Sequence, residues 1–148
     1  DFTGDDRPDS GASTTDGRFL LFAGASNSSL AAPVSIGNGW SEFNAVIGGI
    51  DFDGDGPVDV IGRDAAGRLF VYRGDGEGGW ASSGQQIGDG WSAFTTIDYA
   101  GDMDGDGRGD VVVRANDGSL WLYPTDGQSG WGTPRQIGEG WAPSTAIG

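Results

Sequence analysis

The sequence predicts an all-β fold made of repeated units, and three observations support that prediction. The 148 residues include 30 glycines, too many for a helical protein, and 36% of the chain is hydrophobic, too much for a disordered one. The apolar runs are short, rich in Val, Ile, Phe and Tyr, and bounded by Gly, Asp and Asn, which is the pattern of β-strands. The third observation is that this whole pattern recurs about every 50 residues.

Three repeats fill the chain as a single array, with boundaries at 1–50, 51–101 and 102–148. Each repeat has an acidic loop, a polar tip followed by an apolar run, a glycine-rich connection, the motif Ile-Gly-x-Gly-Trp and a last short run. In the second and third repeats a further apolar run precedes the polar tip. Runs such as residues 69–72 and 120–123 are apolar at consecutive positions, so both faces of their sheets should be covered. Four short antiparallel strands covered on both faces by like units are typical of β-propeller blades. We therefore predict three four-stranded blades.

The two ends of this array are complementary. The chain opens on an acidic loop with no strand before it and closes on a short run, residues 144–148, with no loop after it. In a closed ring that run would complete the first blade and remove an exposed sheet edge. Propellers have about 4 to 8 blades, so three should not close alone. The sequence predicts a larger ring, formed by a homo-oligomer, most simply a dimer of six blades, or with the remainder of a longer propeller.

The composition excludes several classes of function. A formal charge of -14, from 22 acidic and 8 basic residues, argues against binding nucleic acid or an anionic membrane surface. No apolar stretch approaches the roughly 20 residues of a membrane-inserted helix. The chain has no Cys and no His, so thiolate zinc sites and the common catalytic triads are impossible. A two-carboxylate glycosidase is the remaining easy route, but the acidic residues stand in similar repeats, and we predict that the protein is not an enzyme.

The strongest chemical motif is the loop D-x-D-G-D-G-x-x-D, which is complete in the second and third repeats. Carboxylates at positions 1, 3, 5 and 9 and the carbonyl at position 7 offer hard oxygen ligands in a flexible loop, which favours Ca²⁺. The alternative is a solvated turn of Asp and Gly, which two full copies and a partial one disfavour. The predicted ligands are Asp51, Asp53, Asp55, Pro57 and Asp59 in one loop, and Asp102, Asp104, Asp106, Arg108 and Asp110 in the other.

The first loop departs from this motif, because Thr3 replaces an Asp and Asp6 replaces a Gly. We expect a weaker calcium site there. Its candidate ligands are Asp1, Thr3, Asp5, Arg7 and Asp9, with Arg7 contributing its carbonyl.

Five tryptophans are candidate binding residues for a glycan or cell-surface ligand. Three follow the Gly-x-Gly turn and two lie in glycine-rich connections; they are Trp40, Trp91, Trp141, Trp80 and Trp131. Exposed flat rings would stack on sugars, whereas buried rings would pack between blades, and the sequence leaves both interpretations open. Arg63 and Arg114 could orient sugar hydroxyls, although pairing between blades is the simpler role for them.

These motifs resemble the FG-GAP/VCBS repeats of secreted bacterial proteins, particularly those of actinomycetes. The resemblance rests on D-x-D-G-D-G-x-x-D, the strand G-x-L-[FW]-x-Y and I-G-x-G-W, and it covers essentially the whole chain. It implies an integrin-α-like propeller with calcium in its acidic loops, serving adhesion, recognition or carbohydrate binding. A structural or oligomerisation scaffold appended to a secreted enzyme is the alternative. Weak calcium loops also suit the extracellular space, where we expect the protein to act.

Overall fold

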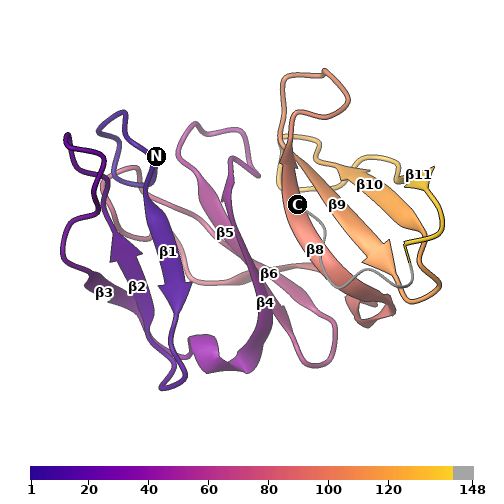
Figure 1. The fold of residues 1–148 in the computed structure, drawn as a ribbon, viewed down its shortest axis with the longest axis horizontal. Coiled ribbons are helices and arrows are strands. Elements are labelled where there is room, and N and C mark those ends of the chain that lie inside the picture. Colours follow the sequence, from indigo (N-terminus) through magenta and orange to yellow (C-terminus); the bar gives the residue numbers. More distant parts are fainter. Residues whose placement is uncertain (142–148) are drawn as a thin grey trace.

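The computed structural model describes residues 1–141, which form three antiparallel β-sheets standing side by side as propeller-type blades (Figure 1). The first blade holds β1 (Ser10–Ser13), β2 (Phe19–Phe22) and β3 (Val34–Gly37). The second holds β4 (Phe43–Ile50), β5 (Asp59–Asp64), β6 (Leu69–Tyr72) and β7 (Gln85–Gly88). The third holds β8 (Phe94–Gly101), β9 (Asp110–Ala115), β10 (Leu120–Pro124) and β11 (Arg135–Gly138). The all-β prediction is confirmed.

The blades are out of phase with the sequence repeats. β4 ends the first repeat in sequence, yet it pairs with β5 of the second, and β8 pairs with β9 in the same way. The expected four strands are present in the second and third blades, but the first has three among residues 1–141. The predicted closing strand, residues 144–148, lies outside the described residues. Within the described part of the chain, one edge of β1 therefore has no partner strand.

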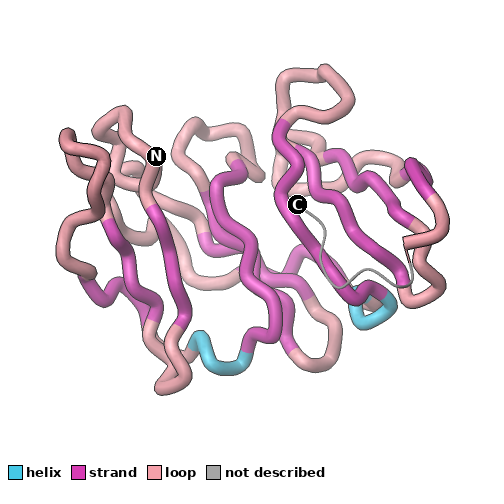
Figure 2. The backbone as a smooth tube through the Cα atoms, viewed as in Figure 1, coloured by secondary structure: helices cyan, strands magenta, loops and turns pink. Residues whose placement is uncertain are grey.

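Helical structure in the described part of the chain is limited to two single turns, which Figure 2 shows at the same end of the second and third blades. These 3₁₀ turns, η1 (Trp40–Glu42) and η2 (Trp91–Ala93), lead from one blade into the first strand of the next. The chain reverses between β5 and β6 at Gly67, whose φ of +82° suits glycine. A side chain there would lie 2.5 Å from the nitrogen of Ser92, so the turn also packs closely on η2. No helix among residues 1–141 is long and apolar enough to cross a membrane.

The hydrophobic core lies between blades rather than inside any one of them. One buried cluster joins the first two blades and includes Phe19, Trp40 and Val60. A second joins the second and third blades and includes Val71 and Trp91. Each blade thus buries an apolar face only because its neighbour covers it.

Two valine-to-alanine substitutions test whether the core lies between the blades. We expect Val71→Ala to lower the free energy of unfolding by roughly 2 to 3 kcal/mol, because Val71 is fully buried between blades. Val34→Ala should cost less than about 0.5 kcal/mol, because Val34 is 61% exposed. Denaturant unfolding followed by tryptophan fluorescence measures both. Equal losses in the two variants would contradict a core placed between blades.

Candidate functional site

The three acidic loops lie at one end of the array, opposite η1 and η2 (Figures 1 and 2). Two of them connect the first and second strands of a blade: residues 51–58 join β4 to β5, and residues 102–109 join β8 to β9. The first loop leads into β1. The loops therefore stand in a row, each at the same end of its blade.

The first aspartate of each loop shapes the loop through its own backbone. Asp51 accepts N–H bonds from Gly54 at 2.8 Å, Asp55 at 3.1 Å and Gly56 at 3.1 Å. Asp102 accepts equivalent bonds from residues 105 and 107, and Asp1 from residues 4 to 6. The carboxylate thus holds the turn closed.

The last aspartate of the first and second loops ties its loop to the rest of its blade. In the third loop, the hydrogen bonds that Asp110 accepts in the described structure come from Met103 and Asp104 of its own loop. Asp59 is fully buried and accepts N–H bonds from Phe52 at 3.0 Å and from Gly74, beyond β6, at 3.1 Å. Asp9 makes the same connection to Gly24, at 2.8 Å, and to the start of its own loop. From the sequence we predicted only a metal-ligand role for Asp9 and Asp59. Their structural role was not visible there, because the donors Gly24 and Gly74 lie 15 residues further along the chain.

The electrostatic environment separates the first loop from the other two. Burial, added to the charges of Asp53 and Asp55, raises the pKa of Asp59 to about 6 despite its two backbone N–H donors. Burial and neighbouring carboxylates also raise the pKa of Asp110. Burial alone would raise the pKa of Asp9, but the N–H donors of Gly24, Thr3 and Phe2 outweigh it and hold this pKa below its ordinary value. The second and third loops therefore carry negative charge that their own donors do not offset.

Two of the predicted metal loops bring three carboxylates together. Oxygen atoms within 4.8 Å of one another come from Asp51, Asp53 and Asp59 in the second loop, and from Asp102, Asp104 and Asp106 in the third. No such group forms in the first loop among the described residues. In the third loop, the buried Oδ1 of Asp110 accepts no hydrogen bond in the described structure. An uncompensated buried carboxylate oxygen beside clustered carboxylates fits a hard cation such as Ca²⁺.

Arginines already pair with some of these carboxylates. Asp53 lies 2.5 Å from the Nε of Arg73, and this pair is largely buried. Arg7 pairs with Asp5 at 2.7 Å, and Arg108 with Asp106 at 3.0 Å, on the exposed side of their loops, where such pairs add little stability. The structure places Asp55 outside the three-carboxylate group of its loop. The carbonyl roles predicted for Pro57, Arg108 and Arg7 stay predictions.

The tryptophans chosen as binding candidates serve mostly in packing. Trp40 and Trp91 are 2% and 5% exposed, so neither ring has a free face for a sugar. Trp80 and Trp131 are half-buried, and their Nε1 atoms donate to backbone carbonyls of the preceding blade, at 2.7 Å and 3.0 Å. Trp141 differs, because it is 42% exposed. The geometry favours the packing interpretation that the sequence left open for the first four rings.

The two arginines also connect successive elements. Arg63 donates to the carbonyl oxygens of Trp91 at 3.1 Å and Phe94 at 2.6 Å, where the chain passes from the second blade to the third. Arg114 donates to the carbonyl of Trp141 at 3.4 Å and to the hydroxyl of Thr95 at 2.9 Å. These bonds agree with pairing between blades rather than with sugar binding.

A groove that the sequence did not indicate runs between the second and third blades at the loop end. It has a volume of about 570 Å³ and is lined by Tyr99, Arg108 and the acidic residues Asp51 and Asp102. Tyr99, at the end of β8, is 38% exposed, and its ring covers Gly109, where an added Cβ would lie 2.7 Å from a ring carbon. One feature of the sequence could have indicated this groove. Tyr99 departs from the repeat, because the second blade has a glycine at the equivalent position.

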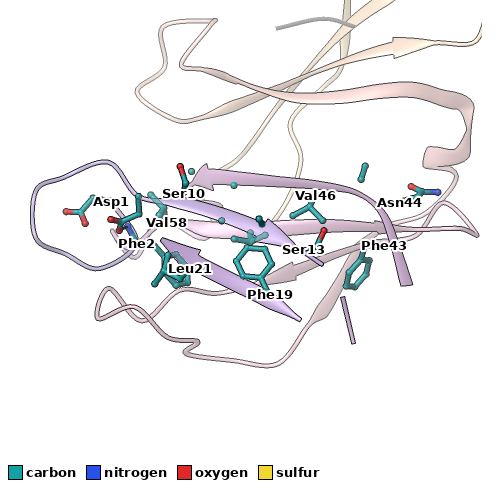
Figure 3. Close-up of a pocket in the computed structure, with 17 residues that line it drawn as sticks. Asp1, Phe2, Ser10, Ser13, Phe19, Leu21, Phe43, Asn44, Val46 and Val58 are labelled. Atoms are coloured by element: carbon teal, nitrogen blue, oxygen red, sulfur yellow. Dashed lines mark hydrogen bonds between the residues drawn. The ribbon is translucent and has the colours of Figure 1, made fainter. Parts of the chain in front are cut away.

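A second groove, of about 660 Å³, follows the unpaired edge of β1 and reaches across to β4. Phe19 of β2 and Phe43 and Val46 of β4 lie along it, with Ser10 and Ser13 on the β1 side (Figure 3). In the second and third blades the corresponding strand edge is covered by β4 or β8. The groove therefore lies at the edge of the first blade that no strand within residues 1–141 covers.

Comparison with known proteins supports the repeat and the fold. Residues 51–113 match the FG-GAP-like repeat. No curated protein matches the chain in sequence. Among solved structures, a lectin of Agrocybe aegerita that recognises non-reducing terminal N-acetylglucosamine is similar, with a TM-score of 0.69 and 22% identity over 98% of this chain. The chain spans 38% of the length of that lectin. This similarity establishes a shared fold.

The loop-tying aspartate gives the second test. We expect Asp9→Asn to lower the free energy of unfolding by roughly 1 to 3 kcal/mol, because an amide cannot accept all three of the N–H bonds that Asp9 now accepts. Asp16→Asn, in an exposed turn, is the matched control and should change little. Chemical denaturation in the presence of a chelator measures both. An unaffected Asp9→Asn variant would show that the tie contributes nothing to stability.

Proposed function

We propose that this protein is a non-catalytic recognition module that binds carbohydrate in the groove between its second and third blades. The observation that carries the proposal is the combination of a half-exposed aromatic ring, Tyr99, with Arg108 and two carboxylates around one groove. Tyrosine presents an apolar ring that can stack on a sugar face, and the charged groups can hydrogen-bond sugar hydroxyls.

The chemistry of the groove restricts the class of ligand. With a formal charge of -14 on the chain and two aspartates at the groove, an anionic ligand would be repelled. A neutral or N-acetylated sugar carries hydroxyl and amide groups without that penalty. The fold shared with a lectin that recognises terminal N-acetylglucosamine supports this class of ligand without fixing the sugar.

The acidic residues are poorly placed for catalysis. Asp59 has the raised pKa of a candidate general acid, but it is fully buried and both of its oxygens accept backbone N–H bonds. A general acid must reach the proton it transfers. The absence of His and Cys from the sequence removes the commonest alternatives.

We infer that calcium stabilises the second and third loops, while the first loop holds it weakly or not at all. Clustered carboxylates in the second and third loops repel one another, and a bound Ca²⁺ would offset that repulsion. Loops of this kind bind in the range set by extracellular calcium, so we place the protein outside the cell. The second candidate function, a calcium-rigidified scaffold in a ring of more than three blades, rests on the inter-blade core and needs no glycan.

Calcium removal tests the metal part of the proposal. We expect chelation to lower the melting temperature by roughly 10 °C or more, because two sites filled well above their dissociation constants each add a few kcal/mol. Calorimetric titration should find two sites in the wild type and one in Asp104→Asn. Asp89→Asn, an exposed aspartate outside the loops, is the control and should keep both. Unchanged melting in excess chelator would refute calcium stabilisation.

Glycan binding is tested at Tyr99. We expect Tyr99→Ala to weaken binding to neutral glycans on an array at least about tenfold, which corresponds to the loss of one stacked ring, whereas Tyr99→Phe should retain most of it. Asp16→Ala, remote from the groove, controls for general effects. If the wild type binds no glycan but still melts in a calcium-dependent way, the scaffold function replaces the lectin function.

A further inference from the structure

The contact that joins neighbouring blades is repeated within the chain, and one side chain of the later blade carries it. Trp80 of the second blade packs edge-on against Phe2, with ring centroids 5.1 Å apart, and Trp131 of the third blade packs in the same way against Phe52, at 5.0 Å. Both tryptophans occupy the same backbone position, bridged to Gly74 and Thr125. The first blade has Leu30 at this position, bridged to Gly24. We call Leu30, Trp80 and Trp131 the docking residues.

Each docking residue meets a receiving face on the preceding blade. This face consists of the second residue of the acidic loop, the isoleucine of Ile-Gly-x-Gly-Trp and the tryptophan of that motif. The docking tryptophans lie 5.5 Å and 5.0 Å from the motif tryptophans and donate to the isoleucine carbonyls. The three receiving faces are Phe2, Ile36 and Trp40 in the first blade; Phe52, Ile87 and Trp91 in the second; and Met103, Ile137 and Trp141 in the third.

The two ends of the array expose the unused halves of this contact. On the first blade, the docking residue Leu30 is 51% exposed. On the third blade, all three residues of the receiving face are exposed, Met103 at 52%, Ile137 at 37% and Trp141 at 42%. Their counterparts Phe2 and Phe52 are 6% and 0% exposed. One end of the molecule thus presents a docking residue and the other presents a receiving face.

The backbone two residues before each docking residue has the same left-handed conformation in all three blades. The N–H groups of Gly78 and Ser129 donate to the carbonyls of Phe2 and Phe52, and both residues have positive φ, at 87° and 69°. Ser28 of the first blade holds the same left-handed conformation, with φ of 60°, although serine rarely adopts it.

The loop glycines repeat this pattern on the receiving side. At Gly4 and Gly54 a side chain would collide with a carbonyl of the following blade, whereas the space at Gly105, the same loop position in the third blade, is open. The geometry that receives a neighbouring blade is therefore present at the third blade without the neighbour.

We propose that the free faces of two copies of this chain dock head to tail, with Leu30 of each copy on the Met103–Ile137–Trp141 face of the other, closing a ring of six blades. The residue types support a second copy as the occupant. Both internal contacts pair Phe with Trp, and the two free faces carry Met and Leu, so the aromatic pair is replaced on both sides by a flexible aliphatic pair. Six blades fall within the range of about 4 to 8 in which propellers close.

Light scattering after size exclusion, in calcium, tests the proposal on the full chain. We expect the wild type to have twice the monomer mass of 15.2 kDa, and Leu30→Asp and Met103→Asp each to have the monomer mass. Val34→Asp is the matched control: Val34 is an exposed apolar residue of the same blade as Leu30, and its counterparts Gln85 and Arg135 are polar, so this variant should keep the dimer. Because each monomeric variant retains one intact face, mixing Leu30→Asp with Met103→Asp should restore a dimer and show that both are folded.

Cross-linking provides the second measurement, and the absence of native Cys makes it specific. An equimolar mixture of Leu30→Cys and Met103→Cys should form a covalent dimer on oxidation, whereas Leu30→Cys alone should not. A wild-type chain that stays monomeric at every concentration, a series of masses beyond the dimer, or cross-linking of Leu30→Cys with itself would each overturn the closed head-to-tail dimer.

Discussion

The structure depends on one constraint: a blade of this sequence has apolar residues on both faces of its sheet and cannot bury them alone. Its strands are short, and both buried clusters straddle two blades. Docking tryptophans and motif tryptophans therefore meet across blade boundaries, where each contributes to the surface that its neighbour needs. Stability in such an array is a sum of nearest-neighbour contacts, so the ends are its weakest points. The exposed residues of the first and third blades follow directly from that rule.

The acidic loops combine two roles that are easily confused. The first aspartate of each loop is a structural acceptor that closes the turn. The last aspartate of the first and second loops ties the turn to the strand connection through backbone N–H groups. The aspartates between them add negative charge, which a bound cation would offset. The first loop shows the separation of roles, because it keeps both structural aspartates but replaces Asp53 by Thr3. In that loop the pKa of Asp9 falls, whereas in the second loop the pKa of Asp59 rises to about 6.

Residues that differ between the repeats give the individual blades different surfaces. Residues common to all blades serve packing and loop shape, as Trp40 and Trp91 do. Tyr99 has no aromatic counterpart in the second blade, and it gives the inter-blade groove an exposed ring. Leu30 and Met103 likewise differ from their counterparts and stand at the two free faces. In a repeat protein, residues that differ from their counterparts in the other repeats are therefore the better candidates for binding, because packing between blades already explains the repeated residues.

The sequence by itself determined most of the β-strands and three of the four carboxylates predicted for each of the second and third loops, because strand alternation, turn glycines and loop spacing are local properties. It could not determine which sheet each strand joins: β4 and β8 close one repeat in sequence but pair within the next blade. It also could not show that Asp59 is held by Gly74, or that Trp80 donates to Ile36, because these partners are 15 and 44 residues apart. Only the tertiary structure decides such questions, since burial and long-range hydrogen bonds depend on which blade faces cover one another.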